Sequence, residues 1–90
     1  MTFESTHALV EQVAQAVHEL RITLENHALP GLEAAIVNSQ MALKSLENHP
    51  GGVDGLKQLI ATYTPEQQTQ LNDRLVQARS DHQINGELIR

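Results

Sequence analysis

A seven-residue repeat of apolar side chains near the start of the chain is the feature that most constrains the fold. The repeat comprises Phe3, Val10, Val17 and Leu24, with Val13 and Leu20 at the complementary positions between them. Alternating steps of three and four residues place side chains on one stripe of an α-helix, whereas a strand alternates with a period of two. We therefore predict a long helix from about Phe3 to Ala28, which Pro30 interrupts because proline lacks the backbone donor that a helix needs.

Two shorter apolar stripes follow this interruption. The first comprises Leu32, Ile36, Leu43 and Leu46, with Ser39 at the one position that lacks a large hydrophobic residue. It ends at Pro50-Gly51-Gly52, because proline and adjacent glycines stop a helix and form a loop. The second comprises Leu56, Leu59, Ile60 and Tyr63. It predicts a short third helix, with Asp54 as its N-cap.

The strongest helix start in the chain lies at Thr64-Pro65. Thr64 can cap the helix, Pro65 suits its first position, and Gln67 completes a Thr-x-x-Gln capping box. The helix is predicted to extend to about Leu88, and Gly86 either lies inside it or caps its end. Its expected buried stripe comprises Leu71, Leu75, Ala78, His82, Asn85 and Ile89.

The scarcity of aromatic residues favours a purely helical fold. Phe3 and Tyr63 are the only aromatic side chains, although 40% of the chain is hydrophobic. A core of Leu, Ala, Val and Ile is typical of packed helices, since β-sheets favour aromatic and β-branched residues. A length of 90 residues allows one modest core. We predict an all-α fold in which residues 1–90 form a single domain, an antiparallel helical bundle of roughly three to four helices with a long first helix.

The charge balance and the hydropathy pattern exclude several classes of partner. Eleven acidic residues against six basic ones give a net charge of −5, so we expect no nucleic-acid binding. The chain has no cysteine, which excludes disulfides and thiolate metal sites. The longest apolar run, Ala34 to Val37, is far shorter than the ~18 residues of a membrane span, and the N-terminus lacks the pattern of a signal peptide. We therefore expect a cytoplasmic protein with no membrane insertion.

The five histidines are the first residues to consider for chemistry. His7 and His18 are about three helical turns apart, and Glu11 lies four residues after His7, a spacing at which two side chains converge. A metal ion needs three or four ligands, however, and no His-x-x-x-His pair occurs. The acidic residues are dispersed and no serine lies in a nucleophile motif. We expect a protein that is not an enzyme and that binds no metal and no cofactor. A melting temperature that changed on adding a chelator would contradict this expectation.

The apolar stripes also suggest a surface that another helix can occupy. Helix-in-groove binding uses side chains at i, i+3, i+4 and i+7, which is the spacing of these stripes. Near the end of the chain, Asn85 could hydrogen-bond across such a contact, and Gly86 would let the partner approach closely. The predicted partner-binding residues are Val10, Val17, Leu24, Leu71, Leu75, Ala78, His82, Asn85 and Gly86. The partner is either another protein or a second copy of this chain in a homodimeric structural or regulatory protein, in the manner of a coiled coil.

The order of these segments resembles the FlgN family of flagellar export chaperones. Residues 82–89, His-Gln-Ile-Asn-Gly-Glu-Leu-Ile, resemble the Asn-Gly-x-Leu-Ile signature late in that family. Residues 25–29, Glu-Asn-His-Ala-Leu, are similar to the Glu-x-x-Ala-Leu at the end of its first helix, and residues 32–47 resemble its second helix. The chain departs from the family at His82, where Asn is usual, and near Gln40, where Lys is common. Family members continue past the Asn-Gly segment, so the resemblance implies a short or truncated relative.

The resemblance implies a chaperone of flagellum biogenesis that acts in type III export. Such a protein is expected to bind the C-terminal amphipathic helices of hook–filament junction proteins in the cytoplasm and to deliver them to the export apparatus. The expected contacts are helix-in-groove contacts, which require protein binding but no nucleotide, metal or catalytic residue.

Overall fold

Four helices account for most of the chain in the computed structural model, which describes residues 2–27 and 29–89. They are α1 (Phe3–Glu25), α2 (Leu29–Glu47), α3 (Gly52–Ile60) and α4 (Pro65–Ile89). The described residues contain no β-strand, so the prediction of an all-α fold is confirmed. The first helix is long, at 23 residues, and the fourth is slightly longer, at 25.

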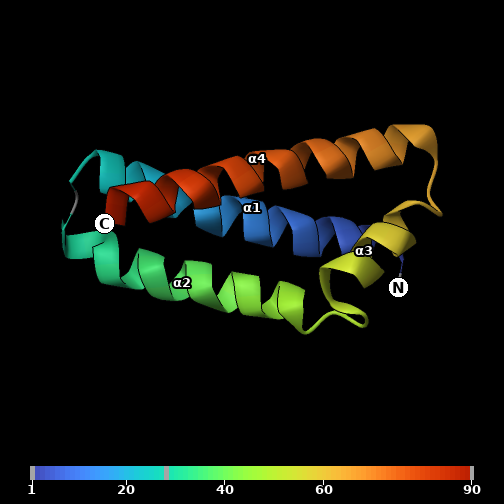
Figure 1. Ribbon diagram of the computed structural model, residues 1–90, viewed down its shortest axis with the longest axis horizontal. Helices are drawn as coiled ribbons and strands as arrows, with labels where there is room; N and C mark the ends of the chain where they lie inside the picture. The colour runs from blue at the N-terminus through green and yellow to red at the C-terminus, as the bar shows by residue number, and fades with distance from the viewer. Residues whose placement is uncertain (1, 28, 90) are drawn as a thin grey trace.

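The three long helices lie side by side with α1 in the middle (Figure 1). α1 packs against α2 on one side and against α4 on the other, whereas α2 and α4 do not approach each other along the described residues. α2 runs in the opposite direction to α1, and α4 runs parallel to α1. Three contacts between α1 and α4 each join residues 63 positions apart, and they are His7 with Gln70, Glu11 with Arg74, and His18 with Asp81. The short α3 lies at one end of the molecule, against both α2 and α4.

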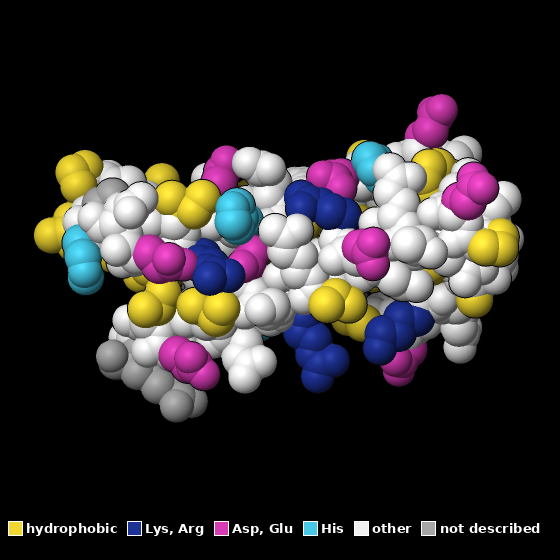
Figure 2. Space-filling view, turned by 90° about the horizontal axis from the view of Figure 1, so that it is seen from above, with side chains coloured by type: hydrophobic (Ala, Val, Ile, Leu, Met, Phe, Trp, Pro, Cys, Tyr) yellow, Lys and Arg dark blue, Asp and Glu magenta, His cyan; other side chains and the backbone are white. Residues whose placement is uncertain are grey.

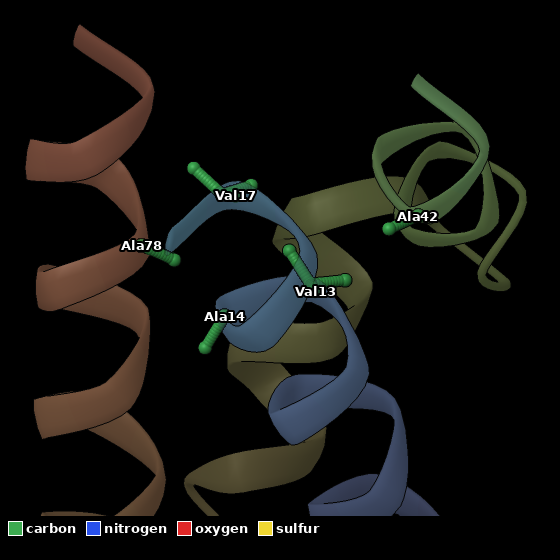
Figure 3. Close-up of a cluster of buried hydrophobic side chains, with 5 residues drawn as sticks. All are labelled: Val13, Ala14, Val17, Ala42 and Ala78. Atoms are coloured by element: carbon green, nitrogen blue, oxygen red, sulfur yellow. The ribbon is translucent and has the colours of Figure 1, made fainter. Parts of the chain in front are cut away.

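Two apolar clusters hold the helices together. In the middle of the molecule, side chains of α1 pack between one alanine of α2 and one of α4, and this cluster comprises Val13, Ala14, Val17, Ala42 and Ala78 (Figure 3). Alanine side chains are small, so both flanking helices can lie close to α1. The second cluster joins α1, α3 and α4 and comprises Val10, Leu56, Ile60 and Leu71. Burial of each large apolar side chain contributes about 1.5–3 kcal/mol, so these clusters supply the main stabilisation of the fold.

The helix ends follow the local sequence in most places. The N–H of Thr64 donates to Gln67 Oε1 at 3.2 Å, and the N–H of Gln67 donates to Thr64 Oγ1 at 3.2 Å, so the predicted capping box is confirmed. Gly86 lies inside α4, which decides between the two positions that the sequence left open. α1 ends at Glu25, earlier than predicted, and His27 has a left-handed φ of 53°, a conformation that commonly follows a helix. The predicted end at Ala28 lies outside the described residues.

The loop before α3 differs from the prediction in its cap. Gly51, and not Asp54, is the N-cap of α3, and its φ of 79° is in the left-handed region that glycine enters without strain. Asp54 lies instead in the first turn of the helix, where a negative charge suits the helix dipole. A Cβ atom at Gly55 would lie 2.1 Å from the carbonyl oxygen of Pro50, so the turn closes tightly. This tight turn places α3 against the neighbouring ends of α2 and α4.

The buried face of α4 also differs from the prediction. His82 and Ile89 were expected in the buried stripe, but both side chains are exposed, and Asp81 is buried instead. The reason is that His18 and Arg21 on α1 provide polar partners that hold the Asp81 carboxylate inside the interface. Periodicity alone predicts an apolar stripe and cannot reveal polar partners that lie on another helix.

Candidate protein-binding groove

The separation of α2 from α4 leaves a groove on one face of the molecule, with a volume of about 770 Å³. Its floor consists of Val13 of α1, Ala78 of α4, and Leu56 and Ile60 of α3. All four side chains are buried, so the floor of the groove is the hydrophobic core itself. Ligand sites in proteins commonly have volumes of ~300–1,000 Å³, and this groove falls within that range.

Large apolar side chains that the chain leaves partly exposed form the walls of the groove. Leu43 and Leu46 come from α2, and Leu75 comes from α4. At the rim, Val53 is 44% exposed and Val76 is 68% exposed. Contiguous exposed apolar surface is typical of an interaction site, whereas single exposed hydrophobic residues are not. The walls and the rim therefore mark this groove as the candidate binding site.

The charged side chains that line the groove are all basic. They are Lys57 of α3 and Arg79 of α4, with His82 beside them, and no acidic residue is among the described residues that line the groove. The whole chain carries eleven acidic residues against six basic ones. Arg21 and Arg74 form ion pairs with carboxylates, whereas Lys57 and Arg79 form none with any described residue. The groove thus has the opposite sign of charge to the chain as a whole.

The structure separates the predicted partner-binding residues by their position. Those that line the groove are Leu75, Ala78 and His82. Those that are fully buried against other helices of the same chain are Val10, Val17 and Leu71. In this folded state the buried side chains hold α1, α3 and α4 together, so a partner cannot reach them without unfolding the molecule.

The remaining predicted residues, Leu24, Asn85 and Gly86, do not line the groove. Asn85 is buried, and its Nδ2 donates to the carbonyl oxygen of Val17 at 3.0 Å. A hydrogen bond across a helix contact was predicted for Asn85, and its acceptor lies on α1 of the same chain. Gly86 is exposed, and a Cβ atom there would meet no described residue within 4 Å, so none of the other described helices approaches it closely. Leu24 is half-buried near the end of α1.

A polar cluster next to Asn85 joins α1 to α4. The Asp81 side chain is only 2% exposed, and its carboxylate accepts a hydrogen bond from Arg21 Nη1 at 2.8 Å and lies 3.2 Å from His18 Nδ1. A buried carboxylate is costly unless it is paired and hydrogen-bonded, so these contacts are what allow Asp81 to lie inside the interface. Such contacts form in only one alignment of the two helices, and we infer that they help to set the register between α1 and α4.

The Arg21 guanidinium is hydrogen-bonded to two carboxylates, those of Asp81 and Glu25. Its hydrogen bond with Asp81, and secondarily that with Glu25, raise the pKa of the Arg21 guanidinium above its ordinary value. A basic group whose pKa is higher in the folded state stabilises that state at every pH below its unfolded pKa. The contribution of Arg21 is therefore present across the physiological pH range and is lost as the pH rises through its raised pKa in strong alkali.

The histidines have separate partners. The predicted approach of His7 to Glu11 is present at 3.8 Å, and His7 also lies 3.3 Å from Gln70 of α4. His18 contacts Asp81 instead. Among the residues that the structure describes, no group of three or more His, Asp or Glu side chains is placed to hold a metal ion.

A second apolar surface lies at the end of the molecule away from α3. Its residues are 44–75% exposed and comprise Ile22, Leu29, Leu88 and Ile89. Figure 2 shows hydrophobic side chains at the end that holds the C-terminus, with histidine and acidic side chains beside them, and hydrophobic, acidic, basic and histidine side chains mixed along the rest of the face that carries α4. A shallower hollow of about 300 Å³ between α1 and α2 includes Ile22 in its lining. None of the described helices has the combination of length and hydropathy required to cross a membrane.

Sequence reasoning missed most of the groove because it treated the stripe of α2 as core. The residues of α2 that the structure buries are Ser39 and Ala42, and the leucines beside them remain half-buried. The small size of Ser39 and Ala42 was the available signal, since small residues allow the closest approach to α1. The position of Lys57 and Arg79 in the groove had no local signal, because it depends on where α3 packs.

The chain matches no protein-family model, no curated protein and no solved structure in comparisons with all three.

Proposed function

We propose that this chain binds an amphipathic helix of another protein in the groove between α2 and α4, and that it acts as a helix-binding chaperone or adaptor. The observation that carries the proposal is the apolar groove, whose floor is the hydrophobic core and whose walls are half-exposed leucines. A bound helix that covered these side chains would gain roughly 25 cal/mol for each Å² of apolar surface removed from water.

The arrangement of the helices supports a helical occupant. α3 has nine residues, so it spans ~14 Å along its axis, whereas the molecule is 41 Å long. α1 packs against both α2 and α4, which do not contact each other along the described residues, and α3 packs at only one end of the open face between them. In a four-helix bundle a fourth long helix would fill this position. A helix supplied by a partner would complete the bundle that α3 is too short to complete.

The resemblance to the FlgN family suggests the class of partner. In this form of the proposal the occupant is the C-terminal amphipathic helix of a hook–filament junction protein, held in the cytoplasm before delivery to the type III export apparatus. The Asn-Gly segment that carries the resemblance lies in α4, where Asn85 bonds to α1. In this proposal the segment acts on binding indirectly, because it holds α4 in place and α4 provides one wall of the groove.

The test is a calorimetric titration of the chain with the last ~40 residues of a hook–filament junction protein, a length that is ample for helix-in-groove binding. We expect saturable binding with a Kd of about 1 μM or tighter and a negative heat-capacity change, since apolar surface is buried. The same titration with Val76→Glu should weaken binding at least about tenfold, because it places a carboxylate at the apolar rim of the groove.

Met41→Glu is the matched control for this experiment. Met41 is 64% exposed and lies outside the groove, whereas Val76 is 68% exposed and lies at its rim. Binding that is equally strong in both variants would place the interaction elsewhere. If the junction peptide produces no heat and sedimentation shows a dimer that Val76→Glu dissociates, the groove is occupied by a second copy, and the homodimeric alternative replaces the chaperone.

A further inference from the structure

The basic side chains in the groove restrict which helices it can accept. We propose that the groove selects an amphipathic helix whose polar flank is acidic, with Lys57 and Arg79 pairing with carboxylates of that helix. This proposal rests on the proposed function and adds the chemistry of the partner to it.

The two bases come from different helices, and both line the same groove. Lys57 belongs to α3, which covers one end of the open face, and Arg79 belongs to α4, which forms a wall. Along α4, the groove-lining residues Val76, Arg79 and His82 are three positions apart, so they follow one side of the helix. A helix that lies on the apolar floor would thus pass a basic residue at the α3 end and another along the α4 wall.

Among the described residues, no carboxylate forms an ion pair with these bases. Arg21 and Arg74 are paired within the chain, with Asp81 and Glu11, whereas Lys57 and Arg79 have no ion-pair partner among the described residues. Asp54 lies three positions before Lys57, a spacing at which helical side chains can meet, yet the two form no ion pair. The pairing capacity of the groove bases therefore remains available to a bound helix.

Apolar contact alone would accept any amphipathic helix of suitable length, and the bases add discrimination. A partner with lysines on its flank would bring like charges together beside a low-dielectric surface, which disfavours that complex. A partner with glutamates would instead form ion pairs at the rim. Because rim ion pairs are individually weak, the expected effect of the two bases is on partner choice and association rate more than on total affinity.

The test compares two synthetic helical peptides of about 18 residues, which span ~27 Å as a helix. Both carry the same leucine stripe, but one has glutamates and the other lysines on the flanking positions. Affinities for the full chain are measured by fluorescence anisotropy at about 0.05 M and about 1 M salt. We expect the glutamate peptide to bind at least about tenfold more tightly at low salt, and this ratio should fall to near unity at high salt because charges are then screened beyond ~3 Å.

The double variant Lys57→Gln/Arg79→Gln should reduce the low-salt ratio by about threefold or more. Lys44→Gln is the matched control, since Lys44 is an exposed base that lies outside the groove lining, and it should leave the ratio nearly unchanged. Circular dichroism of each variant verifies that the fold is retained.

The possible outcomes separate this inference from the function on which it rests. Equal affinity for the two peptides, or a preference for lysines, would overturn acidic selection while leaving helix binding intact. Failure of both peptides to bind would overturn helix binding in the groove and this inference with it. If Lys44→Gln lowers the ratio as much as the double variant does, the preference comes from the overall charge of the surface, and the assignment to Lys57 and Arg79 is wrong.

Discussion

The two halves of the contact between α1 and α4 are built on different chemistry. Near α3, the buried side chains of the contact are apolar, with Val10 of α1 and Leu71 of α4 in a cluster with α3, and the polar contacts of His7 with Gln70 and of Glu11 with Arg74 lie at more exposed positions. Towards the C-terminus, Asp81 and Asn85 of α4 are buried against α1, and Arg21 provides a hydrogen bond to Asp81. The parallel helices keep the same 63-residue offset from His7–Gln70 to His18–Asp81.

Stability and alignment are therefore supplied by separate parts of one interface. Apolar packing is strong but tolerates sliding, since one leucine surface resembles another. Hydrogen bonds to a buried carboxylate are lost when the helices slide, because the charge is then left without a partner. The apolar half therefore provides most of the free energy, and the polar half decides how α4 is aligned. The alignment matters for function because α4 carries one wall of the groove.

The largest expected effect comes from the apolar half. Leu71→Ala should lower the free energy of unfolding by about 2–5 kcal/mol, because it removes a fully buried side chain and leaves a cavity among α1, α3 and α4. Urea denaturation followed by circular dichroism measures this change. Val76→Ala on the exposed side of the same helix is the control, and its effect should stay within about 0.5 kcal/mol. Similar effects for the two variants would contradict the burial of Leu71.

An intermediate effect is expected in the polar half. Asp81→Asn keeps the size of the side chain but removes its charge, so the contacts with Arg21 and His18 weaken. We expect the free energy of unfolding at neutral pH to fall by about 1.5–3 kcal/mol, the range for hydrogen bonds to charged groups. The control is Asp73→Asn, an exposed position of α4, which should be nearly neutral.

Asp81→Asn also sharpens the comparison between the two halves. If the polar half sets the register, this variant should weaken the binding of a helical peptide even after the affinity is corrected for the fraction of molecules that are unfolded. A variant that is destabilised but binds normally once folded would show that Asp81 contributes to stability alone.

The smallest expected effect lies at the end of the polar half. Gly86→Ala should raise the free energy of unfolding by about 0.5–1 kcal/mol, because glycine inside a helix is less favourable than alanine and the added Cβ meets none of the described residues. Thermal denaturation measures the shift. Peptide affinity should be unchanged, since Gly86 does not line the groove. Affinity that drops while stability rises would show that a partner approaches Gly86 closely, as the sequence suggested.

Local features of the chain were predictable because their causes are local. The capping box of Thr64 and Gln67 depends on residues three positions apart, and the loop at Pro50-Gly51 depends on the conformational limits of proline and glycine. The N-cap of α3 was predicted one turn too late, at Asp54, because the left-handed conformation of Gly51 can start a helix without a side-chain cap.

The candidate site was predictable only in part. Leu75, Ala78 and His82 were predicted from the stripe of α4, and the structure places them in the groove. The stripe could not show that Leu71, one to three turns before these residues, is covered by α3 and α1, because periodicity identifies a face and not its neighbour. The groove bases Lys57 and Arg79 were missed for a related reason, since only the packing of α3 brings them to one surface.

By itself, the sequence determined that this chain is helical, where its helices begin and end to within a few residues, and that its net charge is negative. These properties follow from periodicity, capping and composition, which act over a few residues or over the whole chain. The packing of the helices determines which apolar side chains are covered, that Asp81 rather than His82 is buried, and that α2 and α4 do not contact each other along the described residues. Those features depend on contacts between residues about 60 positions apart. The size and the hydrogen-bonding groups of the side chains on one helix determine which side chains a neighbouring helix can bury against them.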